Sequence, residues 1–501
     1  MTQDTVDLLV VGGGINGTGI ARDAAGRGLK VLLAEQRDLA SATSSASTKL
    51  IHGGLRYLEH YEFRLVREAL SEREVLLESA PHIIWPLRFI LPHEKSLRPA
   101  WMIRIGLFLY DHLGGRKRLP ASKRVDLRTG PLQSGLKAEY QIGFAYSDCW
   151  VNDARLVALN ALDARERGVE VLTRSPVLSA KREGKGWIVE IGGDAMIGNQ
   201  PRLVRARALV NATGPWAGSF IDQQIGGKRD GQLRLVKGSH IIVPRLYQGE
   251  HAFILQNEDR RIVFTIPYEG HFTLVGTTDV AYEGDPAGVK ISPEEVDYLC
   301  NVVNRHFKHH VTAADVVWNY AGVRPLFDTD GSESASAISR DYVLDLEDGE
   351  GGAVLLNVFG GKITTYRRLA EHALQKLQPF FPQAGGDWTA KAHLPGGDIA
   401  NADFTSFEAG LAQRFTWLPS EMRHRLARAY GTRIDRIIGT ALSLDGLGTH
   451  FGGDLYESEV RYLIDQEWAR SADDVLWRRS KLGLHLPVEA QDRLRAWFAA
   501  N

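Results

Sequence analysis

Cysteine is nearly absent from this chain, and its scarcity excludes several kinds of site. The sequence of 501 residues includes only Cys149 and Cys300, which are widely separated and form no C-x-x-C pair. A disulfide framework, a thiolate zinc site and an iron–sulfur cluster therefore all lack ligands. Any redox chemistry must use an organic cofactor, and the sequence predicts no metal site.

Excess charge and long apolar runs are also missing. Lys and Arg number 60 and Asp and Glu number 61, which leaves a formal net charge of −1 and no overall field to attract nucleic acid. No uncharged apolar run reaches the roughly 18 residues of a membrane-spanning helix. The N-terminus, Met1 to Val11, is acidic before its apolar stretch, unlike a secretory signal. We expect no nucleic-acid partner and a protein kept in the cytoplasm, either free or on a membrane surface.

Glycine, in contrast, is abundant, with 51 residues, compared with about 7% in an average protein. The first cluster, Gly12-Gly13-Gly14-Ile15-Asn16-Gly17, matches G-x-G-x-x-G between an apolar strand and a helical pattern. In this motif Gly12 permits a tight turn and Gly14 lets the backbone approach a pyrophosphate at the helix N-terminus. Gly17 allows the helix to pack closely on the strand.

A carboxylate completes this N-terminal unit. The second strand, residues 30–34, ends at Glu35, eighteen residues beyond Gly17. A carboxylate at this place accepts hydrogen bonds from ribose hydroxyls and repels a 2′-phosphate. The βαβ unit with its glycine turn and acid therefore predicts a dinucleotide site.

Two further glycine turns decide between NAD and FAD. Asn211 to Trp216 follows a predicted strand and contains Ala212 and Gly214, and Val358 to Lys362 follows another strand and contains Gly360 and Gly361. NAD would make most of its contacts with one doubly wound domain, whereas extended FAD is contacted by turns far along the chain. The two distant turns therefore favour FAD.

The chain divides into three regions of different pattern, and we expect an α/β protein. Residues 239–277 alternate short strands with turn clusters, as in an antiparallel sheet. After residue 382 we expect no further strands, and helical periodicity dominates. The expected domains are a discontinuous FAD-binding domain (1–80, 150–225 and 320–382), a cap domain for the substrate with an antiparallel sheet (81–149 and 226–319), and an all-helical C-terminal domain (385–501).

Several stretches resemble one family over nearly the whole chain. They are Ser44 to Glu59 (SSASTKLIHGGLRYLE), Ser147 to Arg155 (SDCWVNDAR), Asn211 to Trp216, Lys237 to Pro244 (KGSHIIVP), Gly276 to Asp285 (GTTDVAYEGD), Gly322 to Leu326 (GVRPL) and Phe359 to Arg367 (FGGKITTYR). The sequence resembles the FAD-dependent glycerol-3-phosphate dehydrogenases of the bacterial aerobic, membrane-associated type.

The resemblance implies a fold, a reaction and a location. The fold is a Rossmann-like FAD-binding domain of the glutathione-reductase/D-amino-acid-oxidase type with the two other domains given above. The reaction is the oxidation of sn-glycerol 3-phosphate to dihydroxyacetone phosphate on FAD, with electrons passed to ubiquinone. The implied protein is a homodimer, peripheral on the cytoplasmic face of the inner membrane, with a cytoplasmic pool.

The candidate catalytic residues fit a phosphate-bearing alcohol. A phosphate dianion needs cations, and Arg56 beside Tyr57, Arg324 and Lys362 supply them within the matching stretches. Removal of the hydroxyl proton needs a base, for which His is the usual residue near neutral pH. His240 is the first candidate base, and Arg324 is placed to stabilise the developing alkoxide.

The candidate cofactor contacts come from the glycine turns, and the resemblance implies further contacts to the flavin pyrophosphate and ring from a polar loop after the second strand. A Ser-rich linker would have a similar composition to this loop, which contains Thr43, Ser44, Ser45, Thr48 and Lys49. His52, the second candidate base, is assigned instead to the loop that passes the flavin ring. The predicted cofactor contacts are Gly12, Gly14, Asn16, Gly17, Glu35, Thr43, Ser44, Ser45, Thr48, Lys49, His52, Gly53, Gly54, Ala212, Gly214, Gly360, Gly361, Lys362 and Thr364.

One stretch predicts contact with a membrane surface. Residues 100–113 (AWMIRIGLFLYDHL) form a helical pattern with a broad apolar face. A basic cluster follows, and residues 98–128 contain eight basic and two acidic residues, a local charge of +6. Such a helix beside a basic patch is typical of attachment to anionic lipid, although a core or dimer-interface helix has a similar pattern. The basic cluster is Arg116, Lys117, Arg118, Lys123, Arg124 and Arg128.

Two other functions remain open at this point. An FAD oxidase would pass electrons to O₂, either from the same phosphate or as a relative of the amine oxidases. A non-catalytic FAD-binding redox sensor would use the helical C-terminal region as a partner surface. The sequence does not locate the quinone site or assign a role to that region.

Overall fold

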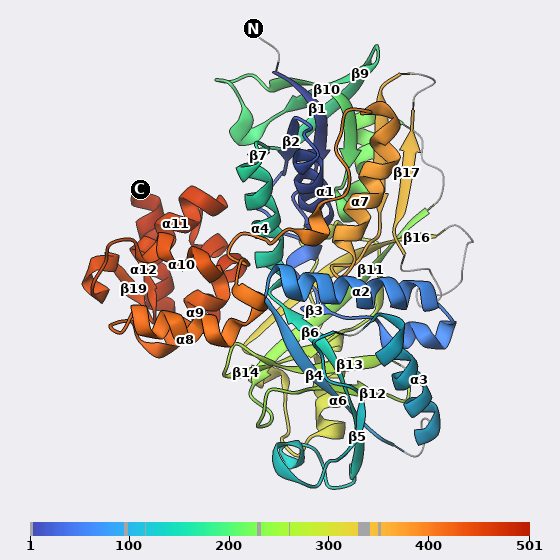
Figure 1. The fold of residues 1–501 in the computed structure, drawn as a ribbon, viewed down its shortest axis with the longest axis vertical. Helices are drawn as coiled ribbons and strands as arrows, with labels where there is room; N and C mark the ends of the chain where they lie inside the picture. The colour runs from blue at the N-terminus through green and yellow to red at the C-terminus, as the bar shows by residue number, and fades with distance from the viewer. Residues whose placement is uncertain are drawn as a thin grey trace.

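The computed structural model describes residues 4–94, 99–115, 117–227, 232–259, 261–328, 341–348 and 352–501. Two sheets lie one after the other along the long axis, and the C-terminal helices gather to one side of the junction between them (Figure 1). Three domain types, α/β, antiparallel and helical, are therefore present as predicted.

The first sheet has the strand order β17-β18-β10-β1-β2-β7; β18, β10, β1, β2 and β7 run parallel to one another, and β17 is antiparallel to β18. The Val- and Leu-rich central strands are buried, as in a sheet covered on both faces. The hairpin β8–β9 extends this sheet by pairing with β10. The strands are β1 (Asp4–Val11), β2 (Val31–Ala34), β7 (Glu170–Leu172), β8 (Val177–Glu183), β9 (Gly186–Ile191), β10 (Arg202–Asn211), β17 (Val343–Glu347) and β18 (Val354–Phe359).

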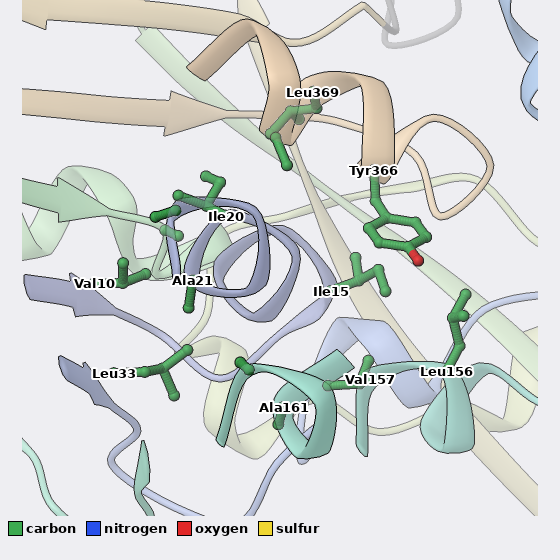
Figure 2. Close-up of a cluster of buried hydrophobic side chains, with 14 of the residues drawn as sticks. Val10, Ile15, Ile20, Ala21, Leu33, Leu156, Val157, Ala161, Tyr366 and Leu369 are labelled. Carbon is green, nitrogen blue, oxygen red and sulfur yellow. The ribbon is translucent and has the colours of Figure 1, made fainter. Parts of the chain in front are cut away.

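Three helices cover one face of this sheet: α1 (Ile15–Gly26), α4 (Asp153–Glu166) and α7 (Tyr366–Leu377). Figure 2 shows α1, which carries Ile20, between α7 with Leu369 and α4 with Val157. These side chains belong to one buried cluster, which fixes α1 and hence the glycine turn that precedes it.

The second sheet is antiparallel except where β12 runs parallel to β4. Its order is β15-β11-β14-β13-β12-β4-β6-β3, with β16 on β11 and β5 on β6. The strands are β3 (Leu50–Ile51), β4 (Ile84–Pro92), β5 (Lys123–Asp126), β6 (Ile142–Val151), β11 (Gln232–Pro244), β12 (Ala252–Gln256), β13 (Ile262–Tyr268), β14 (Phe272–Gly276), β15 (Val280–Tyr282) and β16 (Trp318–Asp328).

Helices pack on both faces of the second sheet. The amphipathic helix α6 (Pro293–His306) buries Leu299 and Val303 against one face. Helices α2 (Phe63–Ser79) and α3 (Ala100–Leu113) bury Leu70 and Leu107 against the other. No helix within the described ranges combines the length and the hydropathy that a membrane span requires.

The C-terminal domain has its own buried core and consists mainly of α8 (Phe404–Arg414), α9 (Ser420–Tyr430), α10 (Ile434–Ile438), α11 (Glu457–Glu467) and α12 (Val488–Ala500). The prediction that strands stop after residue 382 was wrong at one place. The hairpin of β19 (His450–Gly452) and β20 (Leu455–Tyr456) forms because Gly452 and Gly453 adopt φ of +138° and +55°, which a tight reversal needs.

Two predicted boundaries also need correction. The domain boundary at residue 320 would cut β16, but β16 pairs with β11 from Trp318 to Asp328 and so belongs to the second sheet. The apolar stripe along the charged stretch from about Tyr57 to Ser79 predicts one long helix. In the structure α2 begins only at Phe63, because Tyr61 has a φ of +59° and interrupts the helical backbone after a 3-10 segment.

Candidate functional site

A cavity of about 480 Å³ lies between the two sheets. The turns that follow β1, β10 and β18 line it from the first sheet, and β11 and β16 line it from the second. Crevices at the carboxyl ends of parallel strands are the usual ligand sites of doubly wound sheets. The three glycine turns, which are up to 350 residues apart in the sequence, therefore meet at one place.

Close backbone packing explains the glycines at 12 and 17. Gly12 has a φ of +111°, and a Cβ there would lie 2.4 Å from the carbonyl oxygen of Ala212. A Cβ at Gly17 would lie 1.9 Å from the oxygen of Gly12. Any side chain at these positions would push α1 away from β1 and the turn after β1 away from the end of β10.

The N-terminus of α1 is tied to two other parts of the cavity. The N–H of Ile15 donates to Ser44 Oγ at 3.0 Å, and Asn16 Nδ2 donates to the oxygen of Gly360 at 3.0 Å. Asn16 Oδ1 is buried and has no hydrogen-bond partner among the described residues. A ligand hydroxyl beside Asn16 would satisfy this acceptor, so the geometry fits a polyhydroxylated cofactor.

Glu35 follows β2 and contacts the glycine turn that precedes α1. Its Oε2 accepts from the N–H of Gly13 at 2.6 Å and its Oε1 from the N–H of Arg37 at 2.7 Å. Burial raises the pKa of Glu35, while these two N–H groups favour the carboxylate. Each oxygen keeps a further lone pair, and Glu35 lines the cavity, so it can also accept from ribose hydroxyls.

The floor of the cavity is a strip of sheet without side chains. Gly238 of β11 lies directly opposite Gly322 of β16, between the rung of His240 and Tyr320 and the rung of Arg324. A Cβ at Gly322 would come within 2.8 Å of the Cβ of Ala46. The paired glycines thus leave a gap between a histidine and an arginine on one face of the sheet.

His240 is fixed on this floor. Its Nε2 lies 3.0 Å from Thr48 Oγ1, and its ring stacks on Tyr320 with centroids 4.7 Å apart. Burial lowers the pKa of His240 to about 3, and the positive charges of Lys49 and Arg324 add to this effect. The imidazole is therefore uncharged at physiological pH.

Two cationic side chains line the same cavity. Arg324 forms an ion pair with Asp279, and Lys362 Nζ lies 3.6 Å from the centroid of the Tyr57 ring. Arg324, Lys362 and Tyr57 all line the cavity. The side chain of Arg56 lies outside the described part of the structure.

Five predicted cofactor residues do not line the cavity: Gly17, Ser45, Lys49, Gly53 and Gly54. The ammonium of Lys49 is buried 2.8 Å from Asp153 Oδ1, where it holds the turn that presents Thr48 to His240. The other predicted contacts border the cavity. They are Gly12, Gly14, Asn16, Glu35, Thr43, Ser44, Thr48, His52, Ala212, Gly214, Gly360, Gly361, Lys362 and Thr364.

Sequence reasoning missed several residues of the site. Gly238 and Gly322 were part of matching stretches, and a glycine inside a strand is itself a signal of close approach by a ligand or backbone. Asp279, the partner of Arg324, follows β14 in a loop and carries no such signal. Trp216, Gln223 and Gln224 border the cavity next to the Asn211 turn.

Comparison with known proteins agrees with this geometry. The profile of the family described as FAD dependent oxidoreductase matches residues 7–367, and that of the C-terminal domain of alpha-glycerophosphate oxidase matches residues 388–498. The two matches end and begin close to the start of the helical C-terminal domain.

Individual relatives cover nearly the whole chain. A glycerol-3-phosphate dehydrogenase of Pseudomonas aeruginosa is 59% identical over 99% of this chain and 96% of its own. A D-erythritol 1-phosphate dehydrogenase of Brucella abortus is 55% identical over 99% of this chain and 98% of its own. The crystal structure of glycerol-3-phosphate dehydrogenase from Bacillus halodurans with FAD matches with a TM-score of 0.76 and 26% identity, covering 100% of this chain and 95% of that one.

Proposed function

This chain belongs to the family of FAD-dependent glycerol-3-phosphate dehydrogenases, and from this membership we propose that it oxidises sn-glycerol 3-phosphate to dihydroxyacetone phosphate and passes the electrons to ubiquinone. The observation that carries the substrate proposal is that Arg324, Lys362 and Tyr57 line one cavity together with a neutral His240.

The cofactor contacts follow from the cavity. The N-terminus of α1 and the Gly12–Gly14 backbone suit a pyrophosphate, because helix N-terminal N–H groups bind anions. Glu35 accepts from the ribose of the adenosine half, and Asn16 Oδ1 accepts from a cofactor hydroxyl. The bare strip at Gly238 and Gly322 gives a flat ring and a small substrate room above the sheet.

Arg324 and Lys362 bind the phosphate group of the substrate. A dianion in a partly buried site needs more than one cation, and the planar fork of Arg suits phosphate oxygens. Asp279 holds Arg324 and Tyr57 lies under Lys362, so both cations are oriented before the substrate arrives. The resemblance adds Arg56 to this set.

His240 acts as the base. FAD, when bound, supplies the acceptor for the hydride that leaves C2. The hydroxyl proton passes to the unprotonated imidazole of His240, and the C2–O bond becomes a carbonyl. The hydride carries two electrons and one proton away from C2, and the second proton is transferred to the histidine, so the oxidation is balanced. The guanidinium of Arg324 stabilises the negative charge that develops on the oxygen during this step.

Helix α3 is the proposed membrane contact. Trp101, Ile105 and Phe108 are 62%, 54% and 60% exposed, and large apolar side chains this exposed on one helix mark a docking surface. Exposed basic residues follow directly: Lys117, Arg118, Lys123, Arg124 and Arg128. Their charge favours an anionic lipid surface, which would place the enzyme as a peripheral protein beside its quinone acceptor.

Steady-state kinetics test this function. With a short-chain ubiquinone analogue as acceptor, we expect sn-glycerol 3-phosphate to support turnover, with a higher kcat/KM than D-erythritol 1-phosphate. Peroxide formation should account for a small fraction of the electrons. Stoichiometric peroxide would instead identify an oxidase, and a higher kcat/KM with D-erythritol 1-phosphate would reassign the substrate.

A further inference from the structure

The loop after Glu35 is held from outside the FAD-binding domain. Residues 35–37 and 40–42 line the cavity, whereas Asp38 lies behind them with its side chain only 3% exposed. The carboxylate of Asp38 accepts from Arg479 Nη1 and Nη2, each at 2.8 Å, and from Nε of Arg478. Both arginines belong to the C-terminal domain.

The guanidinium of Arg479 donates hydrogen bonds to Asp38 and to the backbone of its own domain. Its side chain is 1% exposed, and its Nε and Nη2 donate to the backbone oxygen of Glu467 at 3.2 Å and 2.6 Å. Removal of the guanidinium would leave the buried carboxylate of Asp38 with only Arg478. Breaking a buried pair from one side is strongly destabilising, since an uncompensated charge remains.

A second link joins the same two parts. The N–H of Arg174, in the connection after β7, donates to the oxygen of Arg37 at 2.8 Å. The guanidinium of Arg174 pairs with Asp474 of the C-terminal domain at 2.5 Å. Arg478 also pairs with Asp474, so both links share this carboxylate. The loop is thus held through its side chain at Asp38 and through its backbone at Arg37.

We propose that Arg479 is a positioning residue for FAD: the C-terminal domain holds residues 35–42 in the conformation that receives the adenosine half of the cofactor. FAD retention and the docking of the C-terminal domain are then coupled, and the coupling is reciprocal. The inference rests on the placement of the adenosine half over Glu35 proposed above. It does not depend on which polyol phosphate is oxidised.

Dissociation of FAD from the holoenzyme, followed by flavin fluorescence, tests the proposal. Arg479→Met should raise the Kd for FAD at least about tenfold, because the loop loses its buried partner. Arg433→Met is the matched control. Arg433 is 8% exposed and pairs with Glu166 of α4 across the same domain boundary, but it does not contact the loop. We expect its Kd to stay within about twofold of wild type, as for distant, uncoupled sites.

The melting temperature of each variant distinguishes a specific loss of FAD positioning from a general loss of stability. We expect both variants to lose stability, whereas only Arg479→Met loses FAD affinity. Equal losses of affinity in the two variants, or an unchanged Kd in Arg479→Met, would overturn the proposal. If Arg479→Met does not fold, Asp38→Asn takes its place, and a wild-type Kd in that variant would overturn it equally. Glu35→Gln tests the premise separately: an unchanged Kd there would refute the placement of the adenosine half.

Discussion

Replacement of Trp101, Ile105 and Phe108 by Ser should detach this protein from lipid vesicles. All three side chains are more than half exposed on α3 and none belongs to a buried cluster, so the change should leave the fold intact. Leu107 and Tyr110, which anchor α3 to the second sheet, are untouched. The perturbation is therefore confined to the surface that is proposed to meet the membrane.

The size of the effect follows from the exposed fractions. Full burial of a large apolar side chain contributes about 1.5–3 kcal/mol. Trp101, Ile105 and Phe108 are 62%, 54% and 60% exposed, so insertion of the remaining surface contributes about 1–2 kcal/mol for each. The three together give about 3–5 kcal/mol on this scale. At about 1.4 kcal/mol for each factor of ten, the triple variant should bind vesicles roughly 10²–10⁴ times more weakly.

Flotation with vesicles that contain anionic lipid measures this binding. Leu442→Ser is the control, because Leu442 is 85% exposed but lies in the C-terminal domain, away from α3. Added salt should weaken wild-type binding as it screens the basic cluster after α3. In solution, the substrate should still reduce the flavin of the triple variant. Unchanged flotation of the triple variant would refute the assignment of α3.

Three further predictions concern the core and the site. His240→Asn should lower kcat by about 10²–10⁴-fold, the usual contribution of general acid–base catalysis, while FAD remains bound; a loss below tenfold would exclude His240 as the base. His82 is completely buried, and burial lowers its pKa to about 3. Between pH 6.5 and pH 3 the unfolded chain binds a proton at His82 and the folded chain does not. As the pH falls through this range, His82 therefore lowers the unfolding free energy by about 1.4 kcal/mol per pH unit. His82→Leu should therefore flatten the decline in unfolding free energy between pH 6 and pH 4 by about that slope, and an unchanged slope in denaturant unfolding would refute this. Gly238→Ala places a Cβ 2.8 Å from Thr277 Oγ1 and 3.1 Å from Arg324 Nη2. Overpacking of this size costs about 1–3 kcal/mol and should raise the KM for the phosphate substrate about tenfold. A wild-type KM would show that the strip at Gly238 and Gly322 is not part of the site.

Local patterns predicted the parts of the site that local backbone geometry determines. The G-x-G-x-x-G turn, the acid at position 35 and the two later glycine turns each need only a strand, a turn and a helix in sequence, and the structure brings them to one cavity. The antiparallel middle section was also predictable, because short alternating strands with turn clusters leave few other architectures.

Contacts that depend on distant pairing were not predictable in the same way. The facing of Gly238 and Gly322 requires the register of β11 with β16. Lys49 has the composition of a cofactor contact, but its ammonium is satisfied by Asp153, which is more than a hundred residues away. Asp38 and Arg479 are separated by 441 positions, and no local pattern links them. The contact of the C-terminal domain with the loop after Glu35 could therefore not be predicted from the sequence.

Anaerobic titration of the FAD-loaded protein with sn-glycerol 3-phosphate is the most direct test of the central claim. If the cavity lined by Arg324, Lys362 and His240 oxidises this substrate, the visible flavin absorbance should bleach in proportion to added substrate, and a ubiquinone analogue should restore it. A flavin spectrum that neither sn-glycerol 3-phosphate nor D-erythritol 1-phosphate changes would contradict the proposed function.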